Sequence, residues 1–155
     1  MKKILLYVFV VLLFAAPFKK AIAHCEIPCG IYGDKMRIEM IKEHISTIEK
    51  SMKMIAELSQ GQSVNYNQLV RWIDNKETHA NEIQHIVAQY FLTQRVKPTD
   101  EQDAAKHKKY LKHLSLLHEM LVYAMKTKQS IDLDNVAKLK ALTDTFNDSY
   151  FEAKK

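Results

Sequence analysis

Residues 34–60 read DKMRIEMIKEHISTIEKSMKMIAELSQ, and no other part of the chain has so clear a structural pattern. Apolar residues recur there at intervals of four and three, at Ile41, Ile45, Ile48, Met52 and Ile55. This spacing follows the period of an α-helix and places the five side chains in one stripe. Gly61 follows the last turn, where glycine often ends a helix. The stretch therefore predicts an amphipathic helix whose apolar stripe needs other elements to cover it.

Three further segments show helical patterns. They run from about Tyr66 to Val96, from a capping-box sequence at residues 99–102, and from Asp132 or Asp134 towards the C-terminus. The residues expected in the core are Leu69, Ile73, Ala80, Ile83, Val87 and Tyr90 in the second helix, Leu114, Leu117, Leu121 and Ala124 in the third, and Val136, Leu139, Leu142 or Thr143, Phe146 and Tyr150 in the fourth. Short connections between long helices favour antiparallel neighbours. The sequence predicts an all-α fold, an antiparallel up-down four-helix bundle over residues 34–155.

The N-terminal segment is typical of a secretory signal peptide. Lys2 and Lys3 precede an apolar run over residues 4–18, and residues 21–23 read Ala-Ile-Ala, a small-residue cleavage pattern. The run is shorter than the roughly 20 residues that a membrane-spanning helix needs. We therefore expect signal peptidase to remove residues 1–23 and the mature protein to be exported, periplasmic or extracellular, without a membrane span. The alternative is an uncleaved anchor.

Removal of this leader changes the charge of the chain. The full sequence has 23 basic and 18 acidic residues, a net charge of +5, and four of the lysines lie in the leader. The mature chain of 132 residues keeps 19 basic against 18 acidic residues, a net charge of +1. A nearly neutral chain has no electrostatic basis for binding nucleic acid. Its length suits one domain with one core.

Residues 24–32 read His-Cys-Glu-Ile-Pro-Cys-Gly-Ile-Tyr and directly follow the expected cleavage site. Cleavage after Ala23 would give His24 a free amine close to Cys25 and Cys29, the only cysteines of the chain. The amine, the Cys25 amide nitrogen and the Cys25 sulfur can form two fused five-membered chelate rings, and Cys29 can supply a fourth ligand. A planar set of two nitrogens and two sulfurs suits Ni(II) or Cu(II), whereas zinc prefers a tetrahedron. Gly30 allows a tight turn straight after Cys29.

Two other arrangements compete with a planar metal site in this chain: a disulfide between Cys25 and Cys29, and a di-iron site on the helices. In an exported protein, two cysteines are by default expected to form a disulfide. A di-iron site like that of some helical bundles is not expected, because residues 82–85 have the Glu-x-x-His spacing but no second such pair exists.

The segment resembles the nickel hook of nickel-containing superoxide dismutases, whose pattern is H-C-x-x-P-C-G-x-Y at the mature N-terminus. Residues 37–39, Arg-Ile-Glu, are similar to the family's segment at the start of the first helix. The resemblance implies a hook over residues 24–33 attached to a four-helix bundle, and assembly as a homohexamer. It implies one nickel ion per subunit, bound by His24, Cys25 and Cys29. The nickel would alternate between Ni(II) and Ni(III) while superoxide is disproportionated to oxygen and hydrogen peroxide, an antioxidant activity.

The resemblance implies roles for two further residues. Tyr32 would stand at the mouth of the site as a gate and hydrogen-bond donor, and Glu39 would orient the imidazole of His24. His79 stands where the family has an arginine, and no role is assigned to it. The second function considered is an exported nickel- or copper-binding module without turnover.

Overall fold

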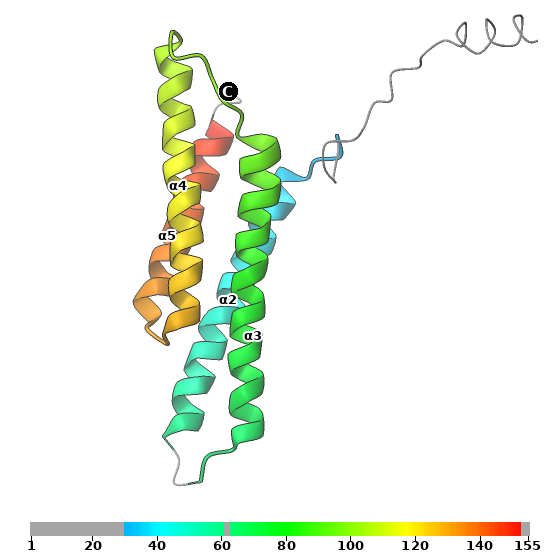
Figure 1. The fold of residues 1–155 in the computed structure, drawn as a ribbon, viewed down its shortest axis with the longest axis vertical. Coiled ribbons are helices and arrows are strands. Elements are labelled where there is room, and N and C mark those ends of the chain that lie inside the picture. Colours follow the sequence, from blue (N-terminus) through cyan, green and yellow to red (C-terminus); the bar gives the residue numbers. More distant parts are fainter. Residues whose placement is uncertain (1–29, 61–62, 153–155) are drawn as a thin grey trace, which may run out of the picture. The chain divides into compact units, whose positions relative to one another are not determined.

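The computed structural model describes residues 30–60 and 63–152. Residues 30–32 belong to an N-terminal unit, and the described residues from Gly33 onward form a second compact unit. This second unit contains the helices α2 (Asp34–Ser59), α3 (Tyr66–His85), α4 (Ala104–Gln129) and α5 (Leu133–Phe151). A π-helical segment, η1 (Ile86–Arg95), continues α3. The predicted fold class, an all-α four-helix bundle, is confirmed (Figure 1).

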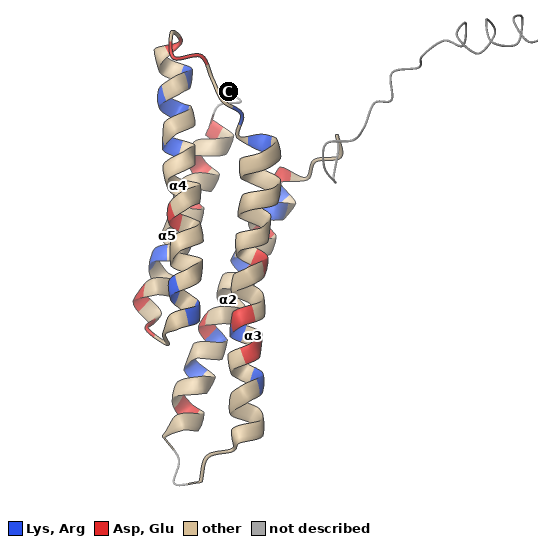
Figure 2. Cartoon of the chain, viewed as in Figure 1, with Lys and Arg blue, Asp and Glu red and all other residues tan. Residues whose placement is uncertain are grey.

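Each helix of the bundle packs on two neighbours. Helix α2 contacts α3 and α5, and α4 contacts the same two helices, so that the four helices enclose one core. Consecutive helices run in opposite directions (Figure 1). Residues of both charge signs are interspersed along the helices (Figure 2). In the ranges that the structure describes, no helix combines the length and the apolar character needed to cross a membrane.

Most of the core follows the apolar stripes predicted from the sequence. In α2, all five residues of the predicted stripe are at most 7% exposed. In α5 the predicted residues are also buried, with Tyr150 half-buried at the C-terminal end. The stripe of α4 is centred differently, because Leu116 and Met120 are buried while Leu114 and Leu121 are only half-buried.

The start of the third helix differs from the prediction. No helix begins at the capping-box sequence of residues 99–102. Helix α4 begins at Ala104, and the side chain of Asp103 caps it by accepting a hydrogen bond from the backbone N–H of Lys106 (3.2 Å). An aspartate directly before the first turn is a strong helix cap. The helix therefore begins after Asp103 and not after Thr99, four residues earlier.

The predicted core was also wrong at the start of α3. Ile73 is 40% exposed and Leu69 is half-buried. The α2–α3 hairpin extends beyond the ends of α4 and α5 (Figure 1). In the part of the chain that the structure describes, no second helix pair therefore covers the first turns of α3.

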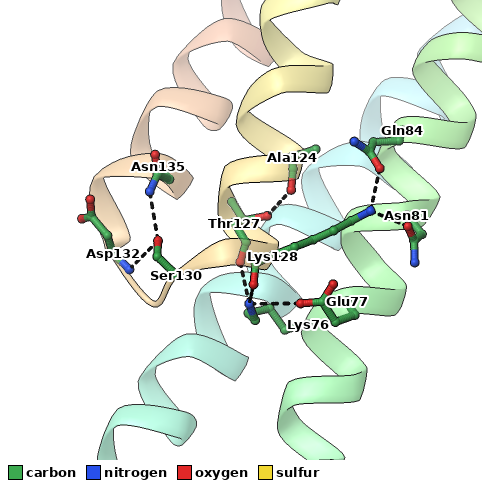
Figure 3. Close-up of polar contacts among 10 residues, drawn as sticks. All are labelled: Lys76, Glu77, Asn81, Gln84, Ala124, Thr127, Lys128, Ser130, Asp132 and Asn135. Carbon is green, nitrogen blue, oxygen red and sulfur yellow. Dashed lines mark hydrogen bonds and ion pairs between the residues drawn. The ribbon is translucent and has the colours of Figure 1, made fainter.

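Two lysines tie α3 to the C-terminal end of α4 (Figure 3). The almost fully buried Lys76 donates hydrogen bonds from Nζ to the backbone oxygens of Thr127 (2.7 Å) and Lys128. In the opposite direction, Lys128 Nζ donates to the side-chain oxygens of Gln84 (2.7 Å) and Asn81. The last carbonyl groups of an α-helix have no partner within the helix, and a cation stabilises that end. Lys76 therefore caps α4 from the neighbouring helix.

Replacement of this cap should destabilise the bundle. In Lys76→Met the stem is kept but two carbonyl oxygens at the end of α4 lose their donor, and we expect the free energy of unfolding to fall by about 2 kcal/mol. Urea unfolding followed by circular dichroism measures this. The matched control is Lys53→Met, which removes an exposed pair with Glu49 and should change stability by less than about 0.5 kcal/mol. Equal effects of the two substitutions would contradict the capping role.

Candidate functional site

The described residues of the N-terminal unit are the last part of the predicted hook. Gly30 has a φ angle of 76°, in the left-handed region that favours glycine. A Cβ atom at Gly30 would meet nothing within 4 Å, so the glycine is needed for its backbone conformation and not for space. This conformation agrees with the tight turn predicted straight after Cys29. The side chain of Tyr32 is 42% exposed.

The predicted nickel ligands His24, Cys25 and Cys29 lie outside the described residues, and their assignment stays a prediction. Their donor atoms fit nickel, because an amine, a deprotonated amide and two thiolates are strong donors suited to square-planar coordination. Binding requires that these groups lose their protons, so the affinity should rise with pH. Within residues 30–60 and 63–152, no group of three or more His, Cys, Asp or Glu side chains could hold a metal ion.

The other predicted site residue, Glu39, lies on the exposed side of α2. Its carboxylate is 3.4 Å from Nζ of Lys35, and the Glu39 side chain is 56% exposed. The neighbouring Arg37 places its guanidinium over the ring of Tyr90, 5.1 Å from the ring centroid. The first turns of α2 thus carry two cations, one of them held against an aromatic ring.

A cluster of polar contacts surrounds Asp34, the first residue of α2. Its Oδ1 accepts hydrogen bonds from Tyr90 Oη (2.6 Å) and Arg95 Nε (2.8 Å). Its Oδ2 accepts hydrogen bonds from Arg95 Nη2 (2.8 Å) and Tyr150 Oη (2.9 Å). We call these four residues the Asp34 clamp. It joins the beginning of α2 to η1 and to the end of α5, one residue after the glycine that connects the bundle to the hook.

The π-helical conformation of η1 explains how Tyr90 and Arg95 reach the same carboxylate. Residues five apart point about 140° away from each other in an α-helix. In a π-helix, hydrogen bonds join residues five apart, so these residues lie nearly one above the other. The bond from Val96 N to Phe91 O (2.8 Å) and the side-chain bond from Thr93 to Ala88 O (2.8 Å) both span five residues. The wider turn therefore brings two donors onto one acceptor.

The hydrogen bonds of the clamp shift the pKa values of its members. Burial alone would raise the pKa of Asp34, but the bonds from Arg95, Tyr90 and Tyr150 outweigh burial and hold it below its usual value. Burial and the bond to Asp34 raise the pKa values of Tyr90 and Tyr150 to about 12. The bond to Asp34 also raises the pKa of Arg95. At neutral pH the clamp is thus an ionised carboxylate held by one guanidinium and two neutral phenols.

Sequence reasoning did not find the clamp. By its position, Asp34 is an ordinary acidic residue in the first turn of a helix. The five-residue interval from Tyr90 to Arg95 predicts no contact with a common partner, because an α-helix places these residues on different sides. Tyr150 was predicted only as a core residue. The π-helical turn that unites these residues has no recognised signal in the sequence of η1.

His79, which received no role from the sequence, pairs with a histidine of the neighbouring helix. Its Nδ1 lies 2.7 Å from Nδ1 of His44 on α2. Among the described residues, Nε2 of His44 is buried without a hydrogen-bond partner. Burial, and next the nearby His79, lower the pKa of His44. The pair links α2 to α3 only while at least one of the two facing nitrogens is unprotonated, because protonation of both would leave no acceptor between them.

We expect loss of the clamp charge to weaken the bundle. Asp34→Asn leaves Arg95 partly buried without its counter-ion and should lower the free energy of unfolding by about 2 kcal/mol, and Tyr150→Phe by about 1 kcal/mol. Because the pKa of Asp34 lies below its usual value, this stabilisation is complete at neutral pH and disappears only as the pH falls below about 4. Urea unfolding at several pH values measures both effects.

The control for Asp34→Asn is Asp144→Asn. Asp144 also joins α5 to α2, through Lys42 at 3.0 Å, but its side chain is 49% exposed. Exposed pairs contribute little, so this variant should lose less than about 0.5 kcal/mol. An Asp34→Asn variant as stable as the control would show that the clamp does not hold the bundle.

Stability should also depend on two histidines near pH 6. Burial lowers the pKa of both His44 and His113 in the folded protein. The unfolded chain then binds protons more readily, so the stabilisation is complete above about pH 6.5 and is lost as the pH falls below that value. His44→Leu should reduce the difference in unfolding free energy between about pH 7.5 and about pH 5.5, measured by urea unfolding. An unchanged difference would show that His44 does not contribute to it.

Comparison with known proteins identifies the family. The family model of nickel-containing superoxide dismutase matches residues 19–154, a range that includes the hook sequence and all four helices. No curated protein and no solved structure gave a match. The family model covers far more than half of the chain and agrees with the helical bundle. The chain belongs to the nickel-containing superoxide dismutase family, whose members are oxidoreductases with a nickel cofactor.

Proposed function

We propose that the mature chain begins at His24 and that His24, Cys25 and Cys29 hold one nickel ion per subunit for the dismutation of superoxide. The observation that carries this proposal is that the family match spans the hook sequence as well as the bundle. The ligands would be the amine and imidazole of His24, the amide of Cys25 and the two sulfurs. When bound, nickel supplies a one-electron couple between Ni(II) and Ni(III), which allows one superoxide to be oxidised to oxygen and the next to be reduced to hydrogen peroxide.

Tyr32 and Glu39 are proposed to assist at the hook. Tyr32 follows Cys29 by three residues, and an exposed phenol can donate a hydrogen bond to a small anion that approaches the site. Glu39 is proposed to orient the imidazole of His24. Glu39 forms an exposed ion pair with Lys35, and such pairs contribute little to stability, so turning the carboxylate towards another partner has a low cost.

The Asp34 clamp supports this arrangement through the chain connection. Only Gly33 separates Tyr32 from Asp34, and Asp34 is fixed by four hydrogen bonds. The point at which the hook leaves the bundle is therefore held by the bundle itself. A fixed attachment point reduces the conformational freedom that must be lost when a short segment closes around a metal ion.

Guidance of the substrate must come from local charge. The mature chain has a net charge of only +1, which gives superoxide little long-range attraction. Lys35 and Arg37 lie on the first turn of α2, just after the hook. We propose that their positive potential attracts the anion, an effect that added salt would weaken.

The same proposal includes export and assembly. Residues 1–23 would be removed by signal peptidase, which places the mature enzyme in the periplasm or outside the cell. The family resemblance implies a homohexamer. Three exposed apolar side chains that lie along one face of α3, Tyr66, Val70 and Ile73, support self-association. Native mass spectrometry of the exported protein counts the subunits directly.

Replacement of either sulfur ligand should abolish the activity. We expect Cys25→Ser and Cys29→Ser to reduce superoxide dismutation by the nickel-loaded mature protein by at least about 100-fold, because a ligand loss exceeds the effect of losing a supporting hydrogen bond. Superoxide decay after a rapid pulse measures the rate, and circular dichroism should show an unchanged helical content.

The control is Ser46→Ala, an exposed substitution on α2 that should keep full activity. A fully active serine variant at either cysteine would contradict the proposed ligands. A wild-type protein that binds nickel or copper tightly but does not consume superoxide would instead favour the binding module without turnover.

A further inference from the structure

A second candidate site lies on the bundle, between the middle of α2 and the start of α3. It is a pocket of about 450 Å³, within the size range of small-molecule sites. Its lining residues are Thr47, Lys50, Gln68, Arg71, Trp72 and Asn75. We propose that this pocket binds a small aromatic carboxylate, independently of the nickel hook.

The charge of the pocket is positive and uncompensated. Lys50 and Arg71 line it, and none of its described lining residues is acidic. The lysines elsewhere on α2 behave differently, since Lys42 pairs with Asp144 and Lys53 with Glu49. Within the described ranges, neither Lys50 nor Arg71 forms an ion pair, and Lys50 Nζ lies over the ring of Trp72, 5.8 Å from the centroid. Two cations that line one pocket without a carboxylate among the described lining residues favour an anionic ligand.

Two lining residues of the pocket, Thr47 and Asn75, are held in place by hydrogen bonds through Ser51. Asn75 Nδ2 donates to Oγ of the buried Ser51 (2.9 Å), and Ser51 Oγ donates to the backbone oxygen of Thr47 (2.8 Å). This chain of bonds fixes two lining residues before any ligand arrives. A preformed wall lowers the entropy that binding would otherwise cost.

The combination of groups points to a ring with one carboxylate. The half-buried indole of Trp72 lines the pocket, and although Lys50 lies over its ring, the aromatic surface can pack against a planar ring. The guanidinium of Arg71 can bind a carboxylate through two parallel hydrogen bonds, and Lys50 adds a second positive charge. An inorganic anion would use the cations but not the indole, and a neutral ring would use the indole but leave the cations unmatched. Both should therefore bind more weakly.

The test uses a reporter that the chain already contains. Trp72 is the only tryptophan of the sequence, so its fluorescence reports on this pocket alone. Titration of the nickel-loaded mature protein with benzoate should give a saturable change of emission, whereas benzyl alcohol, benzylammonium and inorganic phosphate should not at equal concentration. Arg71→Gln should raise the dissociation constant for benzoate about tenfold, the effect of losing one charge-assisted contact.

The matched control is Lys53→Gln, which removes a positive charge one turn along α2 but does not line the pocket. It should bind benzoate as the wild type does. The proposal is overturned if the emission change saturates with benzyl alcohol as readily as with benzoate, or if Arg71→Gln binds benzoate with the wild-type dissociation constant. It is also overturned if the emission depends on protein concentration and not on benzoate, which would indicate that a second copy of the chain fills the pocket. Superoxide dismutation, measured in parallel, should be the same in Arg71→Gln and wild type, so that failure here is separate from failure of the nickel site.

Discussion

The carboxylate of Asp34 holds the hook end of the bundle together. Its four hydrogen bonds join the first residue of α2 to the π-helical segment and to the end of α5, so three elements depend on one ionised group. The aromatic rings behind it add packing, since Phe91 and Phe146 meet edge to face at 5.1 Å. Such a fixed start matters for α2, because the described residues directly before it, 30–33, form no helical turn that could anchor it.

The parts of the fold that sequence reasoning found are those with a local period. The stripe in α2 and the residues of α5 were predicted correctly, because each helix buries the side that its own apolar residues define. Ile73 was placed in the core wrongly, since its exposure depends on where a different helix pair ends. The burial of Lys76 could not be predicted from its own helix either. Its burial makes sense only beside the free carbonyl groups of α4.

The same distinction separates the hook from the Asp34 clamp. The proposed hook ligands lie within six residues of one another, directly after the expected cleavage site, so they can be predicted from the sequence alone. The Asp34 clamp joins residues up to 116 positions apart in the sequence. It also requires a π-helical turn, which the helix propensities of the amino acids do not predict. The bundle and the proposed hook would thus make separate contributions: the hook would supply donor atoms for nickel, and the clamp fixes Asp34, which follows the hook in the chain.

The proposed nickel site depends most on the free amine of His24, because an acylated nitrogen would have to lose a proton before binding and would change the charge of the ligand set. Intact-mass analysis of the exported protein, combined with superoxide dismutation of the same sample, tests this directly. The account predicts that the active form begins at His24 and that one alanine added before this residue abolishes activity. An active protein with any other first residue, or with that added alanine, would contradict it.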